Sequence, residues 1–174
     1  MKNKIYIGVV TIVCIAIFSA CKKNDFEKLR KDELKKLEQF ITNNYPTLNP
    51  TASGLFYIEQ EKGIGDSIEI GDRVQIFYTI WSLDSIYIDG SGEYEPMELT
   101  VLPPTQLSSS ATAVTQLKGL HEALTYMKKD SKSLLIMPSE LAFGQTGSVT
   151  IGVPGFTTLL MEVEVYKVYP AQSQ

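Results

Sequence analysis

Alternation of apolar and polar residues is the clearest pattern in the chain. Over residues 73–81, one face of an extended chain would carry Val74, Ile76, Tyr78 and Ile80. Over residues 157–169, one face would carry Leu159, Met161, Val163 and Val165. Successive side chains of a strand point to opposite faces, so both stretches predict strands with one buried face. Shorter strands are predicted over residues 54–60, 97–102 and 133–137.

A helical spacing governs two other stretches. Residues 22–44 repeat apolar positions every three to five residues, namely Phe26, Leu29, Leu34, Leu37, Phe40 and Ile41. This predicts an amphipathic helix, which residues 43–46 end because the residue before Pro46 disfavours helix. A shorter helix is predicted over residues 119–129, with a stripe of Leu120, Leu124 and Met127. The first helix either holds the domain off a membrane, alone or paired, or packs on its own domain.

The order of these elements predicts the fold class. Several strands, one short helix and two further strands indicate an antiparallel α+β domain with a helix on one face of its sheet. Turns are predicted at Gly63, Gly65 and Gly71–Asp72. A mobile loop is predicted over residues 106–115, which are rich in Ser, Thr and Ala, and a long loop over residues 139–156. We place the domain at residues 51–169, after a helix and linker in residues 21–50 and before a tail at 170–174.

The start of the chain is typical of an export signal. Lys2 and Lys4 precede an uncharged, mostly apolar run over residues 5–18, and small residues come directly before Cys21. The pattern resembles the lipobox of bacterial lipoproteins, which predicts a signal peptide over residues 1–20 and lipid on Cys21. An ordinary secretory signal with an incidental cysteine is the alternative. With lipid on Cys21, we expect an anchored protein of the bacterial cell envelope, on a periplasmic or outer-membrane face.

Composition then excludes several classes of function. The chain has 174 residues, with 16 basic and 20 acidic side chains, which is room for one domain and a targeting segment. Loss of Lys2 and Lys4 with the signal would leave a net charge of −6, which gives nucleic-acid binding no electrostatic support. Cys21 would then be the only cysteine, so no intrachain disulfide, cysteine nucleophile or cysteine-built zinc site is expected.

Conventional catalytic motifs are missing from the sequence. His121 is the single histidine, and we expect it on the surface of the short helix. The glycine pairs at 63–65 and 90–92 lack the rest of a phosphate-binding motif and predict turns. We therefore expect neither a metal nor a cofactor. Apolar residues near loops, with Asp89 among them, suit a reaction without proton transfer, such as rotation about an X-Pro bond, whose barrier of about 20 kcal/mol comes from amide resonance.

Four stretches in order resemble the FKBP-type peptidyl-prolyl cis-trans isomerases over residues 54–168. They are 71–79 (GDRVQIFYT), 118–127 (KGLHEALTYM), 137–144 (MPSELAFG) and Pro154 followed by 158–165 (TLLMEVEV). The resemblance implies an FKBP-like fold, in which a curled antiparallel sheet wraps one short helix, here with an N-terminal helical extension. It also implies that the chain isomerises X-Pro bonds in an apolar cleft.

The resemblance also assigns site residues. The positions nearest the reacting bond are Tyr78, Asp89 and Phe143, and the substrate-binding positions are Ile88, Met97, Leu117 through its backbone N–H, Leu120 as floor and Met161. Each has a structural alternative: Tyr78, Leu120 and Met161 as plain core residues, Asp89 as a turn residue that caps nearby N–H groups, and Phe143 as a loop-packing aromatic.

Departures from the family pattern weaken the expected site. Four site positions differ from the aromatic residues usual in the family, namely Ile88, Met97, Phe143 and Met161. At Phe143 the difference is the loss of a hydroxyl that donates to the ligand. Loss of one hydrogen bond typically costs about 0.5–1.5 kcal/mol, so weaker binding is the expectation. The first hypothesis is an isomerase that assists the folding of exported proteins. The alternatives are a weakly active chaperone or binding lipoprotein, and a purely structural lipoprotein.

Partners follow from these hypotheses. We expect unfolded or exported polypeptides that contain proline, a membrane reached through the lipid anchor, and no nucleic acid. Pairing of two copies through the helix at residues 22–44 stays open from the sequence.

Overall fold

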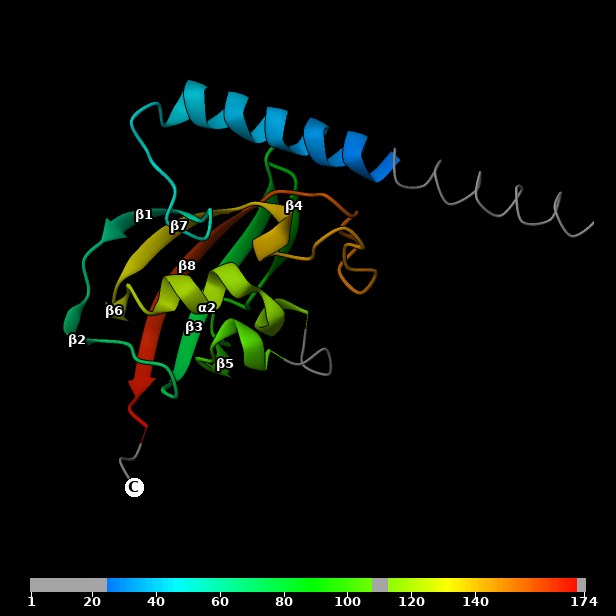
Figure 1. The fold of residues 1–174 in the computed structure, drawn as a ribbon. Helices are drawn as coiled ribbons and strands as arrows, with labels where there is room; N and C mark the ends of the chain where they lie inside the picture. The colour runs from blue at the N-terminus through cyan, green and yellow to red at the C-terminus, as the bar shows by residue number, and fades with distance from the viewer. Residues whose placement is uncertain (1–24, 108–112, 172–174) are drawn as a thin grey trace, which may run out of the picture.

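The computed structural model describes residues 25–107 and 113–171 (Figure 1). The expected signal peptide, Cys21 and the centre of the loop at 106–115 lie outside the described residues. An N-terminal helix covers residues 25–44 and ends directly before Tyr45–Pro46, as the sequence predicts.

One antiparallel sheet forms the body of the domain. Its strand order is β1, β7, β8, β3 and β4, and β5 pairs with the same strand β3. The bounds are β1 Phe56–Glu61, β3 Arg73–Ser82, β4 Tyr87–Gly90, β5 Met97–Thr100, β7 Lys132–Met137 and β8 Leu159–Tyr169. The helix α2, Lys118–Leu124, lies across one face of the sheet (Figure 1). The α+β prediction is confirmed.

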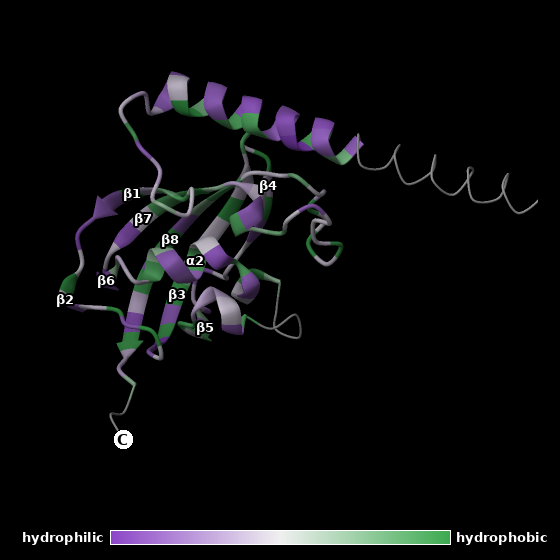
Figure 2. Cartoon of the chain, viewed as in Figure 1, coloured by the Kyte–Doolittle hydropathy of each residue, from purple (hydrophilic) through white to green (hydrophobic). Residues whose placement is uncertain are grey.

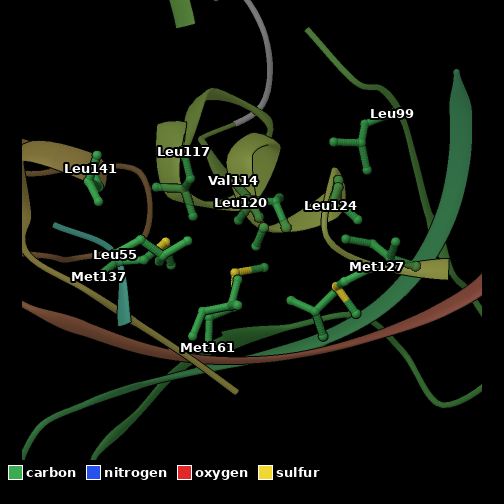
Figure 3. Packing of buried hydrophobic residues seen from close by; sticks show 14 of the residues in the cluster. Leu55, Leu99, Val114, Leu117, Leu120, Leu124, Met127, Met137, Leu141 and Met161 are labelled. Atoms are coloured by element: carbon green, nitrogen blue, oxygen red, sulfur yellow. The ribbon is translucent and has the colours of Figure 1, made fainter. Parts of the chain in front are cut away.

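The core lies between the sheet and α2. The alternation in β3 and β8 is confirmed, because Val74, Ile76 and Ile80 are fully buried, as are the four predicted residues of β8. Leu120, Leu124 and Met127 face them from the helix side (Figure 3). Helix and sheet approach closely at Gly119, where a Cβ atom would lie 2.7 Å from Met137 Sδ. A larger residue at Gly119 would require the Met137 side chain or α2 itself to shift.

The secondary structure differs from the prediction in three places. Residues Ile64–Ser67 form β2, which pairs with β6, Lys128–Lys129, in a separate two-stranded sheet where we expected turns and helix. β2 is exposed along its length, so it has no buried face to produce an alternation. The strand β4 was also not predicted. α2 stops at Leu124 because the Thr125 hydroxyl donates to the Glu122 carbonyl at 2.7 Å and tight turns follow.

The N-terminal helix packs on its own domain. Its apolar residues lie largely on the side toward the domain (Figure 2), and Leu37 is buried. Glu33 is only 4% exposed and bonds to Ser139 and Thr158 of the domain. Among the helices of the described residues, none combines the length and apolar character needed to cross a membrane.

His121 is buried, so the prediction of a surface histidine is wrong. Only 2% of the residue is exposed. Its Nδ1 accepts the Leu102 N–H at 3.1 Å, and its Nε2 lies 2.9 Å from the Thr115 carbonyl oxygen. These two bonds require the neutral ring with its proton on Nε2. The ring thereby links Leu102 to Thr115, which lie on either side of the Ser-rich loop.

This burial predicts a pH-dependent stability. Burial lowers the pKa of His121 below its ordinary value of 6.5, although the hydrogen bond to Thr115 opposes that shift. Below about pH 6.5 the unfolded chain therefore binds a proton that the folded chain does not. The free energy of unfolding then decreases as the pH is lowered, by up to about 1.4 kcal/mol per pH unit. Urea unfolding of the untagged protein between pH 5 and 8 measures this slope.

His121→Gln supplies the control, because no other histidine exists in the chain. The variant is expected to be less stable at pH 8 but to lose most of the slope between pH 5 and 6.5. An unchanged slope in the variant would contradict the assignment to His121.

Candidate functional site

Tyr78 and Asp89 come from neighbouring strands. Asp89 on β4 pairs with Ile80 on β3, two residues after Tyr78, so both side chains reach the same region. The Tyr78 hydroxyl donates to Asp89 Oδ2 at 3.0 Å, and both residues are half-buried. Burial, then the hydrogen bond to Asp89 and the charge of that carboxylate, raise the pKa of Tyr78 far above its ordinary value of 10.0. Tyr78 therefore stays protonated and does not act as an acid or base near neutral pH.

Ser91 fixes the backbone of Tyr78. The Tyr78 N–H donates to Ser91 Oγ at 3.0 Å, and the Tyr78 carbonyl accepts the Ser91 N–H at 3.0 Å. Sequence reasoning treated residues 90–92 as a plain turn and missed this serine. A short polar side chain directly after a strand that carries a candidate residue was the signal available for it.

The apolar site residues meet at one cluster but at different depths. Leu117, Leu120 and Met161 are fully buried members of the core cluster, and Figure 3 shows Leu120 and Met161 facing each other from α2 and β8. The partly buried residues packed against that cluster include Tyr78, Ile88, Met97 and Phe143. The first group lies beneath the second, so a ligand would meet the partly buried side chains first. Leu120 and Met161 are thus core residues by position, and their role in the site stays a prediction.

The backbone N–H of Leu117 already has a partner. It donates to the Val114 carbonyl at 3.2 Å, at the end of the 3-10 turn Val114–Gln116. The resemblance assigns this N–H to a substrate carbonyl. A substrate would therefore have to replace or share the bond with Val114.

Phe143 lies in the loop between β7 and β8. It follows the 3-10 turn Ser139–Leu141, and Gly144 after it adopts a φ of +65° that only glycine takes easily. The Ser139 carbonyl accepts both the Ala142 N–H and the Gly144 N–H, at 3.0 and 2.7 Å. The backbone on either side of Phe143 is therefore held by one carbonyl.

Two hollows of the surface each contain one predicted site residue. A hollow of about 360 Å³ includes Tyr78 with Phe77 and Thr79, which belong to the outer face of β3. A second, of about 790 Å³, includes Ile88 and lies between the N-terminal helix and residues 152–158. Neither hollow gathers the predicted set. The described residues also contain no group of three or more His, Cys, Asp or Glu side chains placed to hold a metal ion.

Comparison with known proteins decides the family. A family model described as FKBP-type peptidyl-prolyl cis-trans isomerase matches residues 65–166, more than half of the chain. The chain belongs to this family. The matched region runs from β2 into β8 and contains every site residue that the sequence predicted.

Relatives of this FKBP-type chain include several bacterial proteins. It is 31% identical over 150 residues to the FKBP-type 22 kDa peptidyl-prolyl cis-trans isomerase of Escherichia coli, covering 86% of this chain and 66% of the relative. It is 30% identical over 118 residues to an FK506-binding protein of Neisseria meningitidis serogroup B, covering 67% of this chain and 97% of the relative.

Solved structures agree on the FKBP-like fold. The crystal structure of FkpA from Escherichia coli matches with a TM-score of 0.67 and 27% identity, covering 86% of this chain and 65% of that one. A peptidyl-prolyl cis-trans isomerase from Pseudomonas syringae pv. tomato matches with a TM-score of 0.65 and 23% identity, over 83% and 96% of the two chains. The FKBP-type chain spans 66% and 58% of the first two curated relatives.

Proposed function

We propose that the protein isomerises X-Pro bonds of polypeptides at the surface formed by Tyr78, Asp89, Ile88, Met97 and Phe143. The observation that carries the proposal is the Tyr78–Asp89 hydrogen bond at the rim of an apolar cluster, in a chain of the FKBP-type family. Leu120 and Met161 form the base of that cluster, and Leu117 borders it through its backbone N–H.

The reaction does not require these side chains to act as acids or bases. Rotation about an X-Pro bond breaks amide resonance and makes the amide less polar, so an apolar surface that excludes water favours the twisted form over the planar form. Binding of the flanking peptide then selects that form. Tyr78 and Asp89 supply a fixed polar edge, since the hydroxyl is held on the carboxylate and does not ionise near neutral pH.

A second candidate is a binding module with little turnover. Two observations favour it: Phe143 has no hydroxyl to offer a ligand, and the Leu117 N–H is bonded to Val114. Both reduce the hydrogen bonds available to a bound peptide. The apolar side chains at the rim are retained, so affinity for unfolded, proline-containing chains remains in this reading.

We further propose that the protein works at the bacterial cell envelope on exported polypeptides. Support comes from the export signal over residues 1–20 and from Cys21, the expected site of acylation. Only three residues separate Cys21 from the helix at residues 25–44, which packs on the domain, so the anchor would hold the site near the membrane surface. Pairing of two copies through this helix would use apolar side chains that the domain leaves partly exposed, such as Leu34, which is 43% exposed.

A proline-limited refolding assay tests the activity. We expect the purified protein to accelerate refolding, and Asp89→Asn to lower kcat/KM on the order of tenfold, because a hydrogen bond to a charged group is worth roughly 1.5–3 kcal/mol. Tyr78→Phe removes the donor of the same bond and should act in the same direction. Asp84→Asn, an exposed aspartate in the turn between β3 and β4, is the control and should keep the wild-type rate.

The alternative outcomes separate the candidates. A wild-type protein that does not accelerate refolding but suppresses aggregation of an unfolded client would favour the binding module. A protein that fails in both assays would overturn both readings.

Mass spectrometry of the protein made in a lipoprotein-processing bacterium tests the anchor. We expect a chain that begins at Cys21 and carries two or three acyl groups, and that partitions with membranes. The Cys21→Ser control should lose the acyl mass and the membrane association. A wild-type chain that is cleaved but carries no lipid would contradict the anchor.

A further inference from the structure

Glu33 is a buried carboxylate on a helix whose surface is otherwise mostly exposed. The residue is 4% exposed. Its Oε1 accepts the Ser139 N–H at 2.6 Å and the Thr158 hydroxyl at 3.0 Å, and its Oε2 accepts the Ser139 hydroxyl at 2.7 Å. Arg30, one turn earlier, pairs with the same carboxylate at 2.6 Å. Both oxygens are therefore satisfied, which a buried carboxylate requires.

The partners of Glu33 stand at the two ends of one loop. Ser139 comes shortly after β7 ends at Met137, and Thr158 directly precedes the first residue of β8, Leu159. One carboxylate therefore joins the start and the end of the segment 139–158. Neither Ser139 nor Thr158 belongs to the N-terminal helix, so Glu33 connects the two ends of the loop from a neighbouring element.

The loop that Glu33 closes is the one that carries Phe143. The carbonyl of Ser139 accepts the N–H groups of Ala142 and Gly144, the two neighbours of Phe143. The Phe156 N–H donates to the Gly144 carbonyl at 3.0 Å, which ties the same turn to the far end of the loop. A displacement of Ser139 would thus reach Phe143 through only a few covalent and hydrogen bonds.

Other contacts of the helix fall on the same loop. Arg30 pairs with Glu140 at 2.7 Å. Phe26 lies 6.0 Å from Phe156 between ring centroids, and Phe156 has a φ of +56°, a conformation that costs a bulky residue energy and persists only where its surroundings hold it. The helix therefore contacts the loop near its start and near its end.

We propose that Glu33 is a positioning residue of the prolyl-peptide site, which holds Phe143 in place by fixing both ends of the loop at 139–158. This rests on the proposed function. The residue does not touch the bound peptide; it sets the position of the aromatic side chain that does. The N-terminal helix is thereby part of the site's architecture in addition to a connection between the anchor and the domain.

Glu33→Gln tests the proposal with little change in size. An amide has one oxygen and one NH2 in place of two acceptor oxygens. If its oxygen takes the place of Oε1, the Ser139 hydroxyl and Arg30 lose their acceptor; if it takes the place of Oε2, the Ser139 N–H and the Thr158 hydroxyl lose theirs. Either way Ser139, at the start of the loop, loses one of its two bonds to residue 33. With a short X-Pro peptide followed by exchange NMR, we expect KM to rise about fivefold while kcat stays within about twofold, since a loosely held rim weakens binding first. The amide signals of residues 142–144 should shift or broaden.

Two further variants keep the test sharp. Glu38→Gln changes an exposed glutamate on the same helix and should leave KM and the signals of residues 142–144 unchanged. Thr158→Val removes a single donor to Glu33 and keeps the shape of the side chain, so it should move KM in the same direction by a smaller factor. If Glu33→Gln fails to fold, Thr158→Val tests the proposal in its place.

The outcomes separate this proposal from the proposed function. Variants that lower the unfolding temperature but leave KM and the signals of residues 142–144 as in wild type would overturn the positioning role. If wild type binds the peptide without turnover, Kd takes the place of KM in the same comparison. If wild type neither binds nor isomerises, the proposed function fails, and the signals of residues 142–144 alone decide whether Glu33 holds the loop.

Discussion

The pairing of β3 with β8 is the constraint on which the site depends. The two strands run side by side from the Arg73–Tyr169 pair to the Ser82–Leu159 pair. Their shared register buries Ile80 and Met161 as direct neighbours under α2, and it leaves Tyr78 at the edge of the same cluster. A register shift of one residue would turn the apolar side chains to the outer face and remove both the core and the base of the site.

Polar side chains hold the segments around this apolar centre. Ser91 binds the backbone of Tyr78 at the end of β4, His121 joins the two sides of the Ser-rich loop, and Glu33 joins the two ends of the loop that carries Phe143. His121 and Glu33 join segments that are not paired strands, whereas Ser91 extends the pairing of β4 with β3 by one position. The described residues contain no buried side-chain polar atom without a hydrogen-bond partner. Hydrogen bonds within the protein therefore replace the bonds to water that these polar groups lose on burial.

How much the sequence predicts depends on whether a residue's environment is local. The alternation in β3 and β8 and the stripe of α2 are local patterns with one buried face, and the structure confirms them. β2 is exposed along its length and β4 has only four residues, so neither leaves such a pattern. His121 looked like a surface residue because its cover comes from residues 102 and 115, on either side of a loop whose path the sequence does not show.

The candidate site shows the same division. The family resemblance identified Tyr78 and Asp89, and the structure places them in contact. It did not identify Ser91 or Glu33, whose partners are set by tertiary packing. The engagement of the Leu117 N–H by Val114 was equally invisible, because it depends on the 3-10 turn that precedes α2. Ser91 and Glu33 hold backbone next to the site, and the bond to Val114 engages an N–H that the resemblance assigns to the substrate.

The most direct test of the central claim is a titration of the isotope-labelled protein with a short X-Pro peptide, followed by amide chemical shifts. We expect the largest shifts at the proposed site, on Tyr78, Ile88, Asp89, Met97 and Phe143. Shifts confined to the hollow beside the N-terminal helix, around Leu29 and residues 152–156, or to the outer face of β3 around Phe77 and Thr79, would contradict it.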